Sequence, residues 1–321
     1  MRDSFCQAGH AGKLQTPSLR RVNKNVIARI APAVFVFIWS TGFIGAKYGL
    51  PYGEPFAILG YRMVIASFLL AAIASFNKAQ RLTSWNQVTR SAVVGIFFHA
   101  GYLGGVFYAI NQKFPVSVSA LVVSLQPVLV AALSKPLLNH TLVPKQWFGI
   151  FLGFAGVTVA LIPGLTTTKP GQHFRTSALI AELIALASTT TATLLQKRHG
   201  GGIPPIGGTS VQYAAAAIVL LPLAYMTEDM SIDWTPQFIA TFLWLIGALS
   251  LGAVLILYWL LRQGTAASVS SLYYLVPPTT LLMSFVLFGE RLQPLALVGF
   301  AVASTGVALV RDPVSRGKHS K

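Results

Sequence analysis

The chain has 321 residues, of which 54% are hydrophobic and only 10% are charged. A soluble domain carries about a quarter of its residues as charges, so this composition excludes an ordinary soluble protein. Apolar runs of about 20 residues, the length that crosses the hydrocarbon core of a bilayer, follow one another along the chain. The sequence therefore predicts an all-α membrane protein that crosses the bilayer many times.

The formal net charge of +16 would indicate a nucleic-acid partner in a soluble protein. Here the basic residues concentrate in the tails and in alternate loops, where positive charge sets the orientation of membrane insertion and contacts anionic lipids. We therefore expect membrane lipid, and no nucleic acid, as the partner of this charge. The single cysteine, Cys6, excludes an internal disulfide.

Residues 1–29 form a polar, basic segment without the compact apolar stretch of a cleavable signal peptide. The segment is interpreted as a cytoplasmic tail, with a transit peptide as the alternative. Residues 311–321 form a second basic tail. With the N-terminus inside, most of the loop Lys and Arg residues also fall inside, so both termini are expected in the cytoplasm.

Ten apolar runs predict ten membrane-spanning helices. They are Ile30–Tyr48, Pro55–Phe76, Ser91–Asn111, Val116–Leu138, Gln146–Pro163, Ser177–Gln196, Thr209–Met226, Gln237–Leu261, Ala266–Phe288 and Leu292–Val310.

The second half of the chain repeats the first. When Pro127 is placed on Pro277, a shift of 150 residues, proline and glycine positions such as Gly156 and Gly306 coincide without a gap. We therefore expect two five-helix repeats, residues 30–163 and 177–310, joined by a linker at 164–176. Because five is an odd number, the two repeats must lie in opposite orientations, and such inverted repeats are typical of transporters.

Several motifs carry a family resemblance. They are Trp39-Ser40-Thr41-Gly42-Phe43 in the first span, Pro55-Phe56 with Arg62 and Ala66 in the second, the serine-rich segments that lead to Pro127 and Pro277, and Gly289-Glu290-Arg291 followed by Gly299 and Gly306. In their order and spacing, residues 30–310 resemble a drug/metabolite transporter of the EamA branch. One departure is Asn139-His140 where the second repeat has Gly289-Glu290, which favours a loop or capping role for this pair.

The resemblance implies a ten-helix exporter that works by alternating access, without a cofactor, in a bacterial inner membrane. It also implies a central cavity formed mainly by the first, third, fourth, sixth, eighth and ninth spans. Family substrates include amino acids, other small metabolites and drugs, and a fold alone does not choose among them.

Three charged residues in or near the spans are candidates for coupling or charge recognition, because charge inside a membrane is costly. Glu182 is the one acidic residue well inside an apolar run, and could pair with a base, contact a substrate ammonium group or change protonation during transport. Arg62 could instead be held by a structural ion pair or by backbone bonds. Lys47 lies at the very end of its span.

Aromatic and polar residues in the spans expected to face the cavity are the candidates for substrate binding. They are Trp39, Ser40, Thr41, Phe43, His99, Tyr102, Ser124, Gln126, Glu182, Thr189, Tyr273 and Tyr274. Each has a structural alternative, since hydroxyl groups can bond back to their own helix and a lone buried histidine is often a hydrogen-bonded core residue.

Proline and glycine predict where the helices break or pack. Pro127, Pro277 and Pro278 cannot donate to the carbonyl one turn earlier, so a helix break or a simple kink is expected there. Gly101-x-x-x-Gly105, Gly149-x-x-x-Gly153 and Gly299-x-x-x-Ala303 permit close helix approach. They are interpreted as packing within the chain, and a homodimer is compatible with them.

Two strings resemble enzyme motifs, His199-Gly200-Gly201-Gly202 and Ala248-Leu249-Ser250-Leu251-Gly252, but neither has the strand–turn–helix context that such a motif requires. No second His or Cys accompanies His99 at metal-ligand spacing, and no Gly-rich phosphate loop with Lys-Ser/Thr occurs. We therefore expect no catalytic residue, no metal and no ATP-driven step. The leading hypothesis is a secondary transporter that exports amino acids or related metabolites, with protons as a candidate coupling partner. The alternatives are an exporter of lipophilic drugs and, from another class, a polytopic membrane enzyme.

Overall fold

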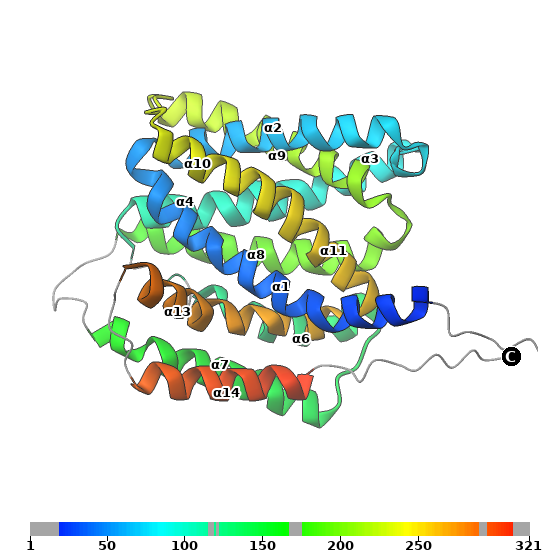
Figure 1. Ribbon diagram of the computed structural model, residues 1–321, viewed down its shortest axis with the longest axis vertical. Coiled ribbons are helices and arrows are strands. Elements are labelled where there is room, and N and C mark those ends of the chain that lie inside the picture. Colours follow the sequence, from blue (N-terminus) through cyan, green and yellow to red (C-terminus); the bar gives the residue numbers. More distant parts are fainter. Residues whose placement is uncertain (1–18, 115–118, 120–121, 167–174, 289–293, 311–321) are drawn as a thin grey trace, which may run out of the picture.

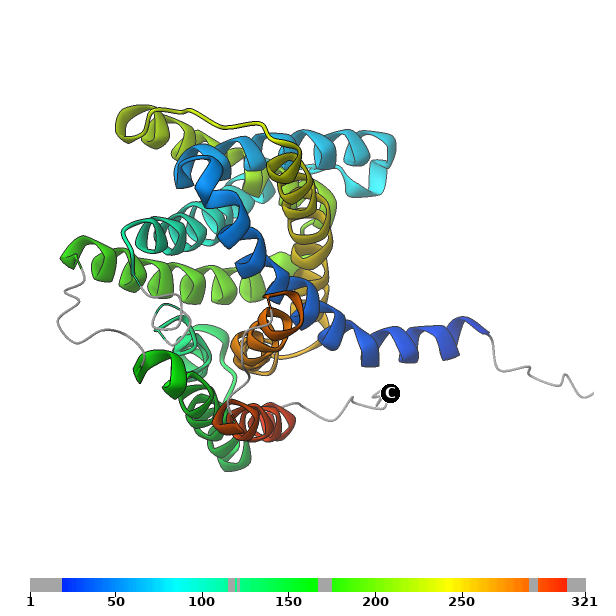
Figure 2. The same cartoon turned by 60° about the vertical axis from the view of Figure 1, so that its left-hand side comes forward.

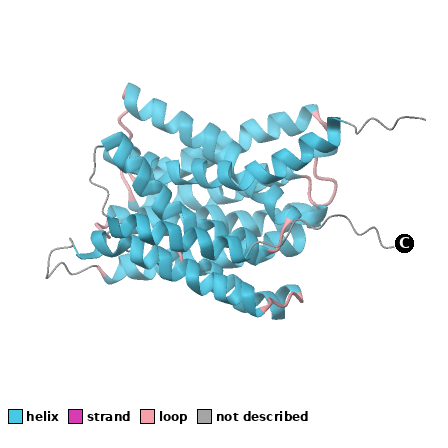
Figure 3. Ribbon diagram, turned by 60° about the horizontal axis from the view of Figure 1, so that its bottom comes forward, coloured by secondary structure: helices cyan, strands magenta, loops and turns pink. Residues whose placement is uncertain are grey.

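The computed structural model describes residues 19–114, 119, 122–166, 175–288 and 294–310. Figure 3 shows that this part of the chain is built from helices, and the only strand-like pairing within it is an isolated bridge between Gly53 and Ile232. Six of the helices are long and apolar enough to cross a membrane, and shorter apolar helices accompany them. The protein is therefore an all-α, multi-pass membrane protein, as the sequence predicted.

The helices of the first repeat occur in the predicted order (Figure 1). They are α1 (Leu19–Gly49), η1 (Leu50–Tyr52), α2 (Pro55–Phe76), η2 (Lys78–Gln80), α3 (Trp85–Gly95), η3 (Ile96–Leu103), α4 (Gly104–Asn111), α6 (Gln126–Leu138) and α7 (Pro144–Thr166). The segments α3, η3 and α4 form one continuous rod whose centre, η3, is a π-helix.

The second repeat has matching elements. They are α8 (Thr176–His199), η4 (Gly200–Gly202), α9 (Pro205–Thr227), α10 (Pro236–Trp244), η5 (Leu245–Ala253), α11 (Val254–Gln263), α12 (Ala266–Ser270), η6 (Ser271–Leu275), α13 (Val276–Phe288) and α14 (Pro294–Val310). The segment η5 is also a π-helix, at almost the same place in its rod as η3 after the 150-residue shift.

The packing of the helices has the symmetry expected of an inverted duplication. The fifth helices of the two repeats, α7 and α14, pack on each other, and so do the second helices, α2 and α9. The contact of η3 and α4 with α8 has its counterpart in the contact of η5 with α1. Figures 1 and 2 place α2 and α9 at one edge of the bundle and α7 and α14 at the other, with α1, α4, α6, α8 and α13 between them.

Helices α7 and α14 meet through glycine at positions that the duplication makes equivalent. A Cβ atom added at Gly156 would lie 2.3 Å from the backbone nitrogen of Ala303. A Cβ atom added at Gly306, which the 150-residue shift places on Gly156, would lie 2.4 Å from the backbone nitrogen of Gly153. These distances are far inside van der Waals contact, so only glycine permits this approach, which is the usual means of helix association in lipid.

The two ends of the bundle differ in their loops. Residues 50–54 and 228–235 meet at one end, here called the Glu228 end, where the Glu228 carboxylate accepts hydrogen bonds from the backbone N–H groups of Phe56 at 2.8 Å and Ala57 at 2.7 Å. This contact satisfies donors that every helix leaves open in its first turn. The opposite end, called the Lys197 end, carries the start of α1 and the end of α14 (Figure 1).

The glycine contact yields a stability prediction. Gly156→Ala should lower the free energy of unfolding by about 1–3 kcal/mol, because α14 must move away from the new methyl group. Gly201→Ala is the matched control, since nothing lies within 4 Å of a Cβ atom there. Thermal unfolding of the purified protein in detergent measures both, and equal melting temperatures for the two variants would contradict the prediction.

Candidate substrate-binding site

A cavity lies in the middle of the bundle, here called the front cavity. Its empty volume is about 580 Å³, including the space at its mouth. Its inner residues Arg62 and His99 are buried, whereas Ile110 on the last turn of α4 is partly exposed, so the exposed end of the cavity lies toward the Glu228 end. The lining residues are Trp39, Gly42, Phe43, Ala46, Arg62, His99, Tyr102, Leu103, Val106, Phe107, Ile110, Leu249 and Val254.

The inner end of the front cavity is formed by the two π-helices. His99 on η3 and Leu249 on η5 both line it, and the 150-residue shift makes them equivalent positions. A π-helix is rare and often marks a functional site, because the extra residue in the turn frees or redirects backbone groups. The Ser250 hydroxyl donates to the carbonyl oxygen of Leu245 at 3.3 Å, five residues earlier.

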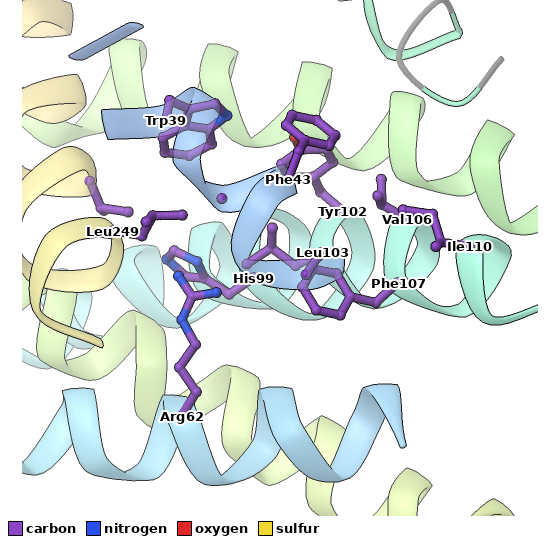
Figure 4. Close-up of a pocket in the computed structure, with 13 residues that line it drawn as sticks. Trp39, Phe43, Arg62, His99, Tyr102, Leu103, Val106, Phe107, Ile110 and Leu249 are labelled. Atoms are coloured by element: carbon purple, nitrogen blue, oxygen red, sulfur yellow. The ribbon is translucent and has the colours of Figure 1, made fainter. Parts of the chain in front are cut away.

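Arg62 reaches the inner end of the cavity from α2 (Figure 4). Its side chain is 4% exposed, and its Nε donates a hydrogen bond of 2.8 Å to the Ser250 hydroxyl. The Tyr213 hydroxyl donates to the backbone carbonyl of Ser250 at 2.6 Å and so ties α9 to the same turn. Within the described residues no Asp or Glu forms an ion pair with Arg62, so the guanidinium group has hydrogen-bonding support but no counter-charge.

His99 lies beside Arg62, and Figure 4 shows its imidazole ring next to the guanidinium group. The ring centroid lies 4.4 Å from that of Tyr213. The Gln212 side chain interacts with the imidazole ring, although neither ring nitrogen forms a hydrogen bond of normal geometry within the described residues. His99 therefore contributes a polar ring to the inner end of the cavity, beside Arg62, Tyr213 and Gln212.

A second, smaller cavity, here called the side cavity, lies behind the aromatic wall of the first. It has an empty volume of about 280 Å³, and it shares Trp39, Phe43 and Tyr102 with the front cavity. The ring of Trp39 meets that of Tyr273 edge to face, with centroids 5.6 Å apart. The remaining lining residues are Val123, Ser124, Val276 and Pro277.

The side cavity lies where helices change their geometry before proline. The chain forms the short 3₁₀ helix η6 just before Pro277, and Leu125 bonds to the carbonyl of Val122, three residues back, just before Pro127. Tyr273 and Tyr274 therefore point to different sides. Tyr273 lines the side cavity, whereas a Cβ atom at Gly153 would lie 2.4 Å from the Tyr274 ring, which packs on α7.

Several predicted site residues lie in helix contacts outside both cavities. Ser40 donates to the carbonyl of Val36 at 2.7 Å, and Thr41 to that of Ile38 at 2.6 Å. Thr189 is buried in α8. The Gln126 amide donates to the Thr193 hydroxyl at 2.9 Å. Pro127 and Pro278 begin α6 and α13 without lining either cavity. The side chain of Lys47 and residues 289–291 are outside the described part.

Glu182 is fully buried in α8 and lines neither cavity. Neither carboxylate oxygen has a hydrogen bond of normal geometry within the described residues. Its electrostatic neighbours include Ser119 and Tyr102, and Tyr102 lines both cavities. Glu182 therefore does not line either cavity, but it interacts with Tyr102, which lines both.

The sixth span, α8, contributes no described residue to either cavity, whereas the second span contributes Arg62. The family resemblance implied a cavity formed mainly by other spans, with the sixth among them and the second not. The reason is glycine: a Cβ atom at Gly101 would lie 2.5 Å from the Ser188 hydroxyl, and one at Gly105 would lie 2.6 Å from the carbonyl oxygen of Ala181. With α8 packed this closely on η3 and α4, no space for a ligand remains between them.

The sequence reasoning missed two groups of site residues. The wall residues Leu103, Val106 and Ile110 follow Tyr102 at helical spacing on one face, and that pattern was visible in the sequence. The supporting residues Ser250 and Tyr213 were not visible, because their role depends on contacts made across 188 and 37 residues of chain.

Ser250→Ala should destabilise the protein by about 1–3 kcal/mol, because it leaves the Arg62 Nε group buried without an acceptor. Ser75→Ala is the matched control, since its exposed hydroxyl only bonds to a carbonyl of its own helix. Unfolding in detergent measures both. A Ser250→Ala protein as stable as the control would show that this bond contributes nothing.

The family model described as the EamA-like transporter family matches residues 28–162 and again residues 176–311. The chain belongs to the EamA-like transporter family. Its two copies of the family domain agree with the inverted five-helix packing described above, and the family is one of membrane transporters.

Curated relatives of this EamA-like chain include three bacterial proteins. It is 27% identical to the uncharacterized transporter YvbV of Bacillus subtilis, covering 87% of this chain and 89% of YvbV. It is 27% identical to PecM of Dickeya dadantii, covering 86% and 89%. It is 25% identical to the uncharacterized inner membrane transporter YedA of Escherichia coli K12, covering 85% and 87%.

A crystal structure gives the same fold. It superposes on this EamA-like chain with a TM-score of 0.71 and 19% sequence identity, over 88% of this chain and 96% of that one. At this identity the match concerns the fold alone.

Proposed function

We propose that the chain is a secondary transporter that exports small metabolites by alternating access, with amino acids and related compounds as the leading substrate class. The observation that carries the proposal is a cavity inside a two-repeat bundle whose lining is partly exposed toward one end and buried toward the other. Exchange of the shapes of two inverted repeats converts such a state into one open at the opposite end.

The closed side is held by polar contacts between helices. Lys197 donates to the carbonyl oxygens of Leu261 at 2.7 Å and Gly264 at 2.5 Å, and Arg262 donates to those of Gly200 and Ile203. These contacts join α8 and η4 to the end of α11. Opening at the Lys197 end requires that they break.

Beyond this closed layer lies a polar depression on the surface of the Lys197 end. It is lined by Asn139, His140, Lys197, Arg198 and Thr265 among others, and has an empty volume of about 810 Å³. Its position supports a second entrance to the transport path. In the proposed orientation, with both termini in the cytoplasm of a bacterial cell and the bundle in the inner membrane, this entrance faces the cytoplasm.

Coupling to protons is assigned in this proposal to Glu182. The residue is a buried acid that forms no ion pair within the described residues, and it lies beside Tyr102 of the cavity wall. Intramembrane acids of this kind commonly act as proton relays in carriers. A change in its protonation would reach the substrate through Tyr102.

An exporter of lipophilic drugs is the second candidate, since most of the front cavity wall is apolar or aromatic. Catalysis forms no part of the proposal. Within the described residues no group of three or more His, Cys, Asp or Glu residues could hold a metal. A homodimer stays a prediction from the glycine motifs.

Transport is tested by uptake of a panel of labelled amino acids and lipophilic drugs into proteoliposomes, with and without a pH gradient. We expect saturable amino-acid uptake that the gradient accelerates. Glu182→Gln should keep saturable uptake but lose its acceleration by the gradient, because the amide cannot exchange the proton. Absence of saturable uptake of every compound by folded protein would contradict the proposed function, and retained acceleration in the variant would exclude Glu182 from coupling.

Alternating access and orientation are tested by cysteine labelling in a Cys6→Ser background. Ile110→Cys reports the mouth of the front cavity, and Thr193→Cys reports the closed side. In intact cells an impermeant maleimide should label Ile110→Cys and spare Thr193→Cys. In membranes that are open to the reagent on both faces, a transported substrate should change the two labelling rates several-fold in opposite directions, and parallel changes would argue against alternating access.

A further inference from the structure

We propose that the front cavity selects organic monoanions. In this assignment a carboxylate binds the guanidinium group of Arg62, an apolar or aromatic body lies along the cavity wall, and a free amino group is not required. The inference rests on the transporter function proposed above and names the substrate class of the same cavity.

The guanidinium group of Arg62 has N–H donors that are not used by the protein residues described. Arginine carries five N–H donors, and the hydrogen bond to the Ser250 hydroxyl occupies the one on Nε. The two terminal nitrogens form no hydrogen bond with the described residues, and the side chain lines the cavity. The side chain is nevertheless 4% exposed, so these donors point into an enclosed space and away from bulk water.

A permanent positive charge in such a place needs an anion. Arginine does not lose its proton in proteins, and Arg62 has no acidic partner within the described residues. The planar fork of the guanidinium group matches the two oxygens of a carboxylate. Ser250 and Tyr213 hold the turn that positions this fork, so the group is oriented before a ligand arrives.

The cavity offers nothing comparable to a cation. No Asp or Glu occurs among the described residues that line the front or the side cavity, and Glu182 lies outside both. Trp39, Phe43 and Tyr102 present aromatic rings that can attract a cation. The positive charge of Arg62 opposes that attraction. Because the described lining contains no acid, the ammonium group of a zwitterion has no negatively charged partner there.

The rest of the cavity sets the shape and the total charge of the ligand. Leu103, Val106, Phe107 and Ile110 form an apolar wall from the inner end to the mouth. A single guanidinium group balances one negative charge, which disfavours phosphate esters that carry two. The depression at the Lys197 end is lined by Lys197 and Arg198, with no acid among its described lining residues, and it also attracts anions to the opposite entrance.

Four ligands with the same aromatic body test the inference. N-acetylphenylalanine is an anion, phenylalanine a zwitterion, phenylalanine amide a cation and N-acetylphenylalanine amide neutral. We expect purified protein in nanodiscs, measured by calorimetry, to bind the anion at least as tightly as the zwitterion, and to bind the cation and the neutral compound roughly tenfold or more weakly. Equal or tighter binding of the cation or the neutral compound, or no binding of the anion, would overturn the inference.

Variants locate the charge. Arg62→Gln should weaken binding of the anion by roughly 30-fold or more and leave the neutral compound unchanged. Because this variant removes a buried group and could unfold, the isosteric pair Ile110→Glu and Ile110→Gln at the partly exposed mouth supplies a second test. Ile110→Glu should weaken anion binding several-fold relative to Ile110→Gln. Equal anion affinity in this pair, or unchanged affinity in folded Arg62→Gln protein, would overturn the assignment.

The outcome is separable from that of the proposed function. Saturable transport of any compound in the amino-acid and drug panel, together with equal or preferred binding of the cationic ligand, leaves a transporter but removes the anion site. Absence of all saturable transport by folded protein removes the transporter function itself.

Discussion

The constraint on which this structure depends is that hydrocarbon supplies no hydrogen bonds. Every backbone N–H and C=O group within the membrane must find its partner in the protein, and for most of the described chain the α-helix provides that partner. The described rods depart from it in the π-helices η3 and η5 and in the 3₁₀ helix η6. Each of these three segments contributes lining residues to a cavity.

Duplication explains why the departures occur in pairs. The two π-helices occupy nearly the same place in the two repeats, and together they form the inner end of the front cavity. The symmetry ends at the side chains, however. His99 in the first repeat stands opposite Leu249 in the second, and Arg62 enters from α2. A symmetric scaffold thus encloses a cavity whose charge comes from one repeat.

Small residues decide where that cavity can be. Glycine lets α7 approach α14, and Gly101 and Gly105 let α8 close against η3 and α4. Between α1 and η3, in contrast, the aromatic residues Trp39, Phe43 and Tyr102 form a wall between two cavities. The arrangement combines rigid outer contacts with a centre that is held by ring packing and a few polar bonds. Such contacts can be rearranged at lower cost than helix backbones in van der Waals contact.

The sequence by itself determined the membrane class, the order of the helices, the duplication and the family, because hydrophobic length and the spacing of Pro and Gly are properties of the chain itself. It also pointed to Arg62, His99 and Trp39, since charged and large polar groups within apolar runs stand out. The tertiary structure decided which of the predicted residues meet. It placed Tyr273 in a cavity but packed Tyr274 on α7. It also placed Glu182 outside both cavities, next to the lining residue Tyr102. It also gave Arg62 its partners Ser250 and Tyr213. These outcomes depend on how closely distant helices approach and how each is rotated, and neither quantity is encoded in local sequence.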